Sequence, residues 1–300
     1  MTHRFHGILP ALITPLTSKG DLSPHAMKAL LRRVYDAGSH GVYVCGSTGE
    51  GLLLPVEIRR EITEVAVRCS PPDKVVIVHV GASRTEDAFA LAAHAAAMGA
   101  HAVASLPPLG PYRFDEVRAC YERLASASSL PFFVYFFPEI APYVTGENIA
   151  ELVRIPHVAG VKFTDFNLFR LSQLRQSGLT VFNGRDEVLA AGLLMGANGG
   201  IGSFYNLIPE TFVALYEHAV RGEWAEAKTA QDSVNELIAL VLRFPMLPAM
   251  KTMLAWSGID CGPCVEPRRA LTSGEKDQLA DALAQSSFAN AVFAPKGATR

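Results

Sequence analysis

Hydrophobic residues along this chain fall into short unbroken runs that alternate with longer stretches of helical periodicity. The run Val75–Val80, for example, is dominated by β-branched residues, which is typical of a parallel strand buried on both faces. The stretch that follows, Glu86–Met98, has the length of a helix and is followed by Gly99, a common helix stop. Such a strand and helix recur about every 25–35 residues, which is the size of a βα unit.

Eight strand-helix pairs of this kind follow one another. The strands are predicted at Gly7–Ile13, Gly41–Cys45, Val75–Val80, Ala102–Leu106, Phe132–Phe137, Val158–Phe163, Thr180–Asn183 and Gly199–Ser203. The helices are predicted at Pro24–Ala37, Pro55–Cys69, Glu86–Met98, Asp115–Ser126, Gly146–Val153, Leu168–Gln176, Glu187–Met195 and Glu210–Val220. This order predicts an α/β fold, a TIM (β/α)8 barrel. An open doubly wound sheet would carry a Gly-rich phosphate turn after its first strand, where this chain has Thr14–Pro15.

The remainder of the chain predicts about three more helices, at Glu223–Phe244, Pro248–Trp256 and Ser273–Gln285. We therefore expect a barrel in residues 1–222 and a C-terminal helical extension in residues 223–300 that packs on the barrel. The end of the chain, residues 289–300, is expected to be loose.

Composition and charge narrow the class of protein. In 300 residues, 49% are hydrophobic and the net charge is −2, which excludes a mainly disordered chain. No basic cluster suggests nucleic-acid binding, and no apolar run reaches the ~18 residues of a membrane helix. We expect no signal peptide. Five cysteines, an odd and sparse set, suit a reducing compartment, so a cytoplasmic location is expected.

In a TIM barrel the active site lies at the carboxyl ends of the strands, which directs attention to Lys162. It ends the apolar run Ala159–Lys162, and an interior lysine is rare because burying an ammonium costs several kcal/mol. Burial favours the neutral amine, which attacks a ketone, so Lys162 is a candidate Schiff-base nucleophile. The alternative is a lysine that reaches solvent or pairs with Asp165.

Other strand ends carry hydroxyl and carboxylate groups. Ser47 and Thr48, in the turn Gly46–Glu50, suit carboxylate binding, or one of them caps the next helix. Tyr135 is either a proton shuttle or a core aromatic. Asp186 and Glu187 suit hydroxyl binding, or they complement a helix dipole.

Two further patterns are weighed and set aside. Cys261 and Cys264 match the spacing of a redox dithiol, but no βαβ pattern surrounds them and Pro267 follows closely. No cluster of His, Cys, Asp or Glu has the spacing of a metal site, so no metal is expected.

Taken together, these residues resemble the dihydrodipicolinate synthase and N-acetylneuraminate lyase superfamily of class I pyruvate-dependent aldolases. The resemblance rests on Gly46–Glu50, Tyr135 with Pro138, Gly160–Lys162 and Gly202–Ser203, and it covers nearly the whole chain. It implies a covalent imine on Lys162, a proton relay through Tyr135 and Thr48, and a substrate carboxylate held by Ser47 and Thr48. No metal or organic cofactor is then needed. Partners are limited to a small 2-oxo acid and to further copies of the chain, commonly a homotetramer.

Within that superfamily the chain is most similar to the N-acetylneuraminate lyase branch. The similarity assigns the hydroxyl-rich tail of the substrate to a set of residues on three strand ends: Thr164, Gly184, Asp186, Glu187 and Ser203. The synthase branch carries an Arg where this chain has Ile140, which argues against that branch.

The chain also departs from the family pattern. Leu109 stands where a neighbouring subunit's site usually receives a Tyr, with Tyr112 three residues on, and Phe136 replaces a frequent Asn. Alternatives therefore remain: an aldolase or dehydratase for another 2-oxo-3-deoxy sugar acid, a dihydrodipicolinate synthase, or a non-catalytic binding protein.

Overall fold

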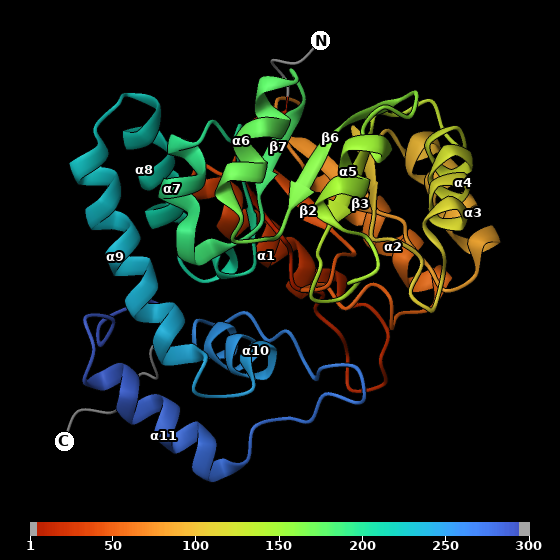
Figure 1. Ribbon diagram of the computed structural model, residues 1–300. Helices are drawn as coiled ribbons and strands as arrows, with labels where there is room; N and C mark the ends of the chain where they lie inside the picture. Colours follow the sequence, from red (N-terminus) through yellow and green to blue (C-terminus); the bar gives the residue numbers. More distant parts are fainter. Residues whose placement is uncertain (1–4, 294–300) are drawn as a thin grey trace.

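The computed structural model describes residues 5–293, and eight parallel strands form its centre (Figure 1). The strands are β1 (Gly7–Pro10), β2 (Gly41–Val44), β3 (Val75–His79), β4 (Ala102–Ser105), β5 (Phe132–Phe136), β6 (Val158–Phe163), β7 (Thr180–Asn183) and β8 (Gly199–Gly202). From β2 to β8 each strand pairs with the next along the chain, and β8 pairs with β1. The gap between β1 and β2 is bridged by the pair Ala11–Tyr43, where the N–H of Leu12 donates to the carbonyl of Tyr43 at 2.8 Å. The predicted (β/α)8 barrel is confirmed.

Helices connect the strands around the outside of the barrel. They are α1 (Pro24–Asp36), α2 (Val56–Cys69), α3 (Thr85–Met98), α4 (Phe114–Ala125), α5 (Gly146–Leu152), α6 (Leu168–Gln176), α7 (Leu189–Leu194) and α8 (Pro209–Val220). Helix α1 shows why they pack there: its buried residues are Ala26, Met27, Leu30, Leu31 and Val34. This spacing places an apolar stripe on one face of the helix.

The core has two layers because alternate strand residues point to opposite sides of the sheet. The inner layer fills the barrel and includes Leu9, Tyr43, Ile77, Phe133 and Phe182. The outer layer lies between strands and helices. The barrel is thus a packed interior, and only its end offers room for a site.

The predicted element boundaries needed two notable corrections. The first strand was predicted to reach Ile13 but ends at Pro10. Beyond it Ala11 forms only an isolated bridge to Tyr43, and the N–H of Ile13 donates to Asn206 Oδ1 at 3.1 Å and not to a neighbouring strand. The helix predicted at Glu187–Met195 is divided into a 3-10 turn, η2 (Asp186–Val188), and α7. The other strands and helices of the barrel agree to within one residue at each end, whereas in the extension the first helix ends three residues before the prediction and the second begins two residues before it.

Three helices follow the barrel: α9 (Trp224–Val241), α10 (Met246–Trp256) and α11 (Ser273–Ala284). Helix α9 runs down beside α7 and α8, and α10 and α11 lie below the barrel (Figure 1). Helix α9 ends before the predicted Phe244 because Pro245 disfavours a helical residue in front of it. The division at residues 222 and 223 stays a prediction.

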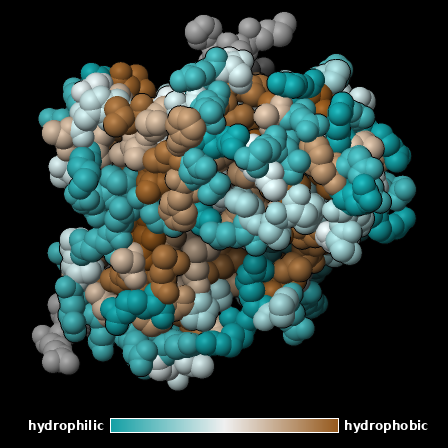
Figure 2. Space-filling model, in the orientation of Figure 1, coloured by the Kyte–Doolittle hydropathy of each residue, from teal (hydrophilic) through white to brown (hydrophobic). Residues whose placement is uncertain are grey.

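Hydrophobic side chains gather where α9 and α10 meet the barrel, between hydrophilic surfaces (Figure 2). Segment 289–300 was expected to be loose, which is wrong for its first part: Phe293 is buried and contacts the ring of Phe288. Residues 294–300 lie outside the described part of the chain.

In residues 5–293 no single helix is long and apolar enough to cross a membrane; α9 and α10 meet that test only as a pair, bent by 108°.

Candidate active site

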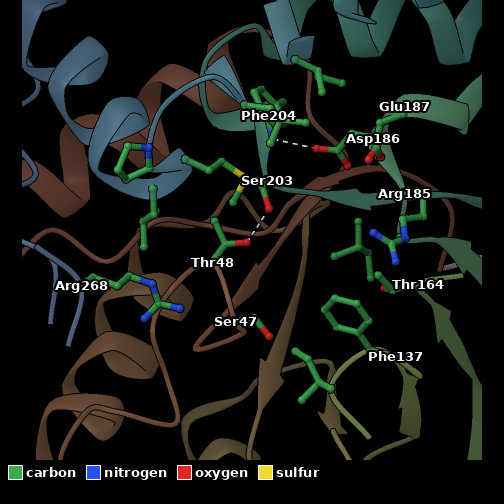
Figure 3. Close-up of a pocket in the computed structure, with 18 of the residues that line it drawn as sticks. Ser47, Thr48, Phe137, Thr164, Arg185, Asp186, Glu187, Ser203, Phe204 and Arg268 are labelled. Atoms are coloured by element: carbon green, nitrogen blue, oxygen red, sulfur yellow. Dashed lines mark hydrogen bonds between the residues drawn. The ribbon is translucent and has the colours of Figure 1, made fainter. Parts of the chain in front are cut away.

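A cavity of about 750 Å³ lies at the carboxyl end of the barrel, between the strand ends and the C-terminal extension. The barrel contributes Ser47, Thr48, Tyr135, Phe137, Ile140, Lys162, Thr164, Gly184, Arg185, Asp186, Glu187, Ile201, Ser203 and Phe204. Residues 245–248 and 267–269 of the extension also line it, and Figure 3 shows many of these side chains facing one another. All nine site residues expected from the sequence line this one cavity.

Lys162 ends up buried, with 4% of its surface exposed, near the end of β6. Its Nζ lies 4.0 Å from the centre of the Tyr135 ring and 4.5 Å from that of Tyr43. No carboxylate of residues 5–293 lies within 4.0 Å of this amine. The structure therefore excludes the alternative of an ion pair with Asp165, and it places in the cavity an amine that forms no direct ion pair with any residue of 5–293.

The conformation of the turn after β2 is fixed by its own backbone and by a hydrogen bond from Thr14. Glu50 has φ = 57°, and Thr14 donates its hydroxyl to the carbonyl of Gly49 at 2.6 Å. Neither hydroxyl of the turn caps α2, whose N-cap is Pro55. Thr48 Oγ1 instead lies 2.6 Å from Ser203 Oγ (Figure 3), whereas the buried hydroxyl of Ser47 has no hydrogen-bond partner among the described residues.

Asp186 is buried on the opposite wall. Its Oδ2 accepts a hydrogen bond of 2.8 Å from the N–H of Phe204 (Figure 3). Burial raises the pKa of this carboxyl to about 7, although the Phe204 N–H bond and the charge of Lys162 lower it. Gly202 is required beside it, since any Cβ there would collide with Asp186 Oδ1. Asp186 is thus held in place and titrates near neutral pH.

A second unpaired hydroxyl lies close to this wall. Thr164 Oγ1 is buried and has no hydrogen-bond partner in residues 5–293. A Cβ at position 184 would collide with this oxygen, so Gly184 leaves it space. Leaving a buried hydroxyl unpaired costs about 1–3 kcal/mol, and a ligand in the cavity can remove that cost for both Ser47 and Thr164.

Sequence reasoning missed several residues in or next to the cavity. Tyr43, an inner-core residue whose ring centre lies 4.5 Å from Lys162 Nζ, could have been found, because it lies on the inward face of a predicted strand. Arg185 was not selected, although it lies between the candidates Gly184 and Asp186. Its guanidinium stacks on Phe137 and Phe166 and pairs with Glu139. Residues of the extension carried no local signal, since only the fold brings them to the barrel.

The departures from the family pattern lie mostly away from this cavity. Leu109 and Tyr112 line a separate hollow of about 220 Å³, so Tyr112 does not line the cavity of its own chain. Phe136 faces the outer core, stacked on Phe163 at 5.3 Å. Ile140 does line the main cavity.

The two cysteines of the dithiol pattern lie in the loop between α10 and α11. Both are free thiols, and burial raises the pKa of Cys261 to about 12 and that of Cys264 to about 11. A redox dithiol needs a lowered thiol pKa, so this environment argues against that alternative. No group of three His, Cys, Asp or Glu side chains in residues 5–293 is placed to hold a metal ion.

Fold and site together define a (β/α)8-barrel protein with a buried lysine in a polar cavity at the strand ends. The chain belongs to the dihydrodipicolinate synthetase family, whose model matches residues 4–286. It is 34% identical over 285 residues to N-acetylneuraminate lyase from Rhizobium meliloti, covering 94% of this chain and 95% of the relative. It is 33% identical to N-acetylneuraminate lyase 2 from Escherichia coli, over 86% and 87% of the two chains. The wild-type sialic acid aldolase of Ruminococcus gnavus superimposes with a TM-score of 0.89 at 28% identity, over 93% and 96% of the chains.

Proposed function

We propose that the protein is a class I aldolase that cleaves a 2-oxo-3-deoxy sugar acid, N-acetylneuraminate in the first place, to pyruvate and an aldehyde sugar. The observation that carries the proposal is the amine of Lys162, buried in the cavity beside Tyr135 and without a direct ion pair in the described residues. The relatives named as N-acetylneuraminate lyases support the choice of substrate.

In the proposed reaction the neutral amine of Lys162 attacks the C2 ketone of the open-chain acid. Loss of water gives a protonated imine, which accepts the electron pair of the C3–C4 bond as that bond breaks. The C4 hydroxyl loses its proton, with Tyr135 as the relay, and the aldehyde leaves. The remaining enamine is protonated at C3, and hydrolysis of the imine releases pyruvate and the free amine. Lysine supplies the electron sink, so the reaction needs no metal or organic cofactor.

The remaining site residues bind the substrate in this proposal. Ser47 and Thr48 hold the carboxylate. The hydroxyl of Ser47 has no other partner, and the hydroxyl of Thr48 is positioned by its hydrogen bond with Ser203. The other wall takes the hydroxyl-rich tail through Thr164, Gly184, Asp186, Glu187 and Ser203. Carboxylates suit that task because each oxygen accepts hydrogen bonds from hydroxyl groups.

The direct test is pyruvate release from N-acetylneuraminate by the purified protein, followed through lactate dehydrogenase. We expect turnover that depends on the sugar acid. An absence of turnover, together with activity on a hexonate or pentonate analogue, would move the substrate assignment to that acid. Borohydride reduction in the presence of pyruvate should also add the mass of a reduced imine, and its absence would favour a non-catalytic binding protein.

Asp186 should give the reaction a pH dependence. Because burial raises its pKa to about 7, the carboxyl is protonated below that pH and ionised above it. The charged form accepts hydrogen bonds from substrate hydroxyl groups more strongly than the protonated form, so kcat/KM for the sugar acid should rise with pH through about 7. Asp186→Asn should abolish this rise. A rise of the same size in the variant would show that another group titrates.

The homotetramer and the cytoplasmic location expected from the family stay predictions. Light scattering of the purified protein would check the first of them. Leu109 and Tyr112 are both exposed on the single chain. They bear on this question because the family resemblance places their segment at a subunit interface.

A further inference from the structure

The C-terminal extension places an arginine in the cavity. The loop between α10 and α11 passes the open end of the barrel, and Arg268 lines the cavity. Figure 3 shows its guanidinium pointing inward on the side of Thr48 and Ser47, with Arg185 and Asp186 on the other side. Its closest carboxylate is that of Glu50, 3.7 Å away, which follows Thr48 by two residues.

The charge of Arg268 is not balanced by the residues around it. Glu50 is already bound: its Oε2 lies 3.0 Å from Lys251 Nζ, and its Oε1 accepts a hydrogen bond of 2.8 Å from the N–H of Val265. A single carboxylate therefore faces two cations. The neighbouring Arg269, by contrast, binds both oxygens of Glu275 at 2.7 Å.

The two walls of the cavity consequently differ in charge. Asp186 and Glu187 make one wall acidic, while Arg268 leaves an excess positive charge on the other. A guanidinium donates five N–H groups and accepts none, in a planar fork that matches a carboxylate. A sugar acid has an acidic end and a hydroxyl-rich end, so this arrangement favours one orientation of it.

We propose that Arg268 is a specificity-determining residue that binds a carboxylate of the substrate. This inference rests on the proposed function, because it takes a 2-oxo acid as the ligand of the cavity. The carboxylate has two possible sources: the C1 acid group next to the ketone, or a second acid group farther along the chain.

The test compares Arg268→Gln with Arg32→Gln, a matched loss of charge at an exposed position on α1 that pairs only with Asp36 and lies outside the cavity. Calorimetric titrations measure the Kd of pyruvate, of 2-oxoglutarate and of methyl pyruvate, which carry one, two and no carboxylates. A charge-assisted hydrogen bond accounts for about tenfold in binding, so Arg268→Gln should raise the Kd of at least one acid by about that factor. Methyl pyruvate should bind equally to both variants and to the wild type. Arg268→Lys, which keeps the charge and loses the fork, should recover part of the affinity.

The outcomes separate the sources and the two proposals. Weaker binding of both acids to Arg268→Gln assigns the C1 carboxylate, and weaker binding of 2-oxoglutarate alone assigns a second acid group. Unchanged Kd values for both acids, or an equal loss in Arg32→Gln, would overturn the role of Arg268. Borohydride trapping of the wild type is scored separately: binding of pyruvate without a trapped imine contradicts the aldolase mechanism and leaves the Arg268 result standing. A wild type that binds neither acid would overturn both.

Discussion

Replacing Lys162 with methionine should abolish pyruvate release and imine trapping while the protein stays folded. The amine is the only group in the proposed reaction that forms a covalent bond to the substrate, and no neighbouring side chain substitutes for it. Methionine nearly preserves the volume between the rings of Tyr43 and Tyr135, so the packing should remain. The free energy of unfolding of the variant should also be equal to or higher than that of the wild type, since it no longer buries a polar amine without an ion pair.

The measurements are the coupled pyruvate assay, mass spectrometry after borohydride reduction, and urea denaturation. Lys162→Ala is expected to be equally inactive. Lys228→Met is the control, because Lys228 is exposed on α9 and pairs only with Asp232. Activity near that of the wild type in either Lys162 variant would contradict the Schiff-base mechanism, whatever the stability data show.

Breaking the ion pair between Glu50 and Lys251 should destabilise the fold by about 3–5 kcal/mol, the usual cost of removing one partner of a buried pair. The two side chains are 0% and 4% exposed, and they join the turn after β2 to α10. In Glu50→Gln the ammonium of Lys251 would lose its anionic partner and keep only neutral acceptors, among them the carbonyl of Pro263 at 2.7 Å. The free energy of unfolding from urea titrations measures this loss.

A double-variant cycle distinguishes the ion pair from other effects. Glu50→Gln combined with Lys251→Met leaves no buried charge without a partner, since Arg268 is exposed, so it should be more stable than Glu50→Gln alone. Lys228→Met breaks an exposed pair and should cost less than about 1 kcal/mol. A loss that small in Glu50→Gln would show that the buried pair does not hold the extension to the barrel.

The chain by itself determined the barrel and the members of the candidate site that lie on its strand ends. Unbroken apolar runs at a regular βα spacing allow few other folds, and parallel strands bring their carboxyl ends to one edge. Lys162, Tyr135 and Asp186 could therefore be assigned to one site although they lie far apart in the chain. Tyr43 was within reach of the same reasoning, from its place on a predicted strand.

Only the tertiary structure decided what the extension does. Arg268 lies 106 residues after Lys162, in a loop with no periodic pattern, so no local signal connects it with the barrel. The partners of Glu50 also carried no local signal. In the sequence Glu50 is only the last residue of a turn, whereas in the structure it forms a buried ion pair with Lys251. Periodicity reports which face of an element is buried. The contacts between distant loops, and the charges they leave unbalanced, depend on how the elements pack.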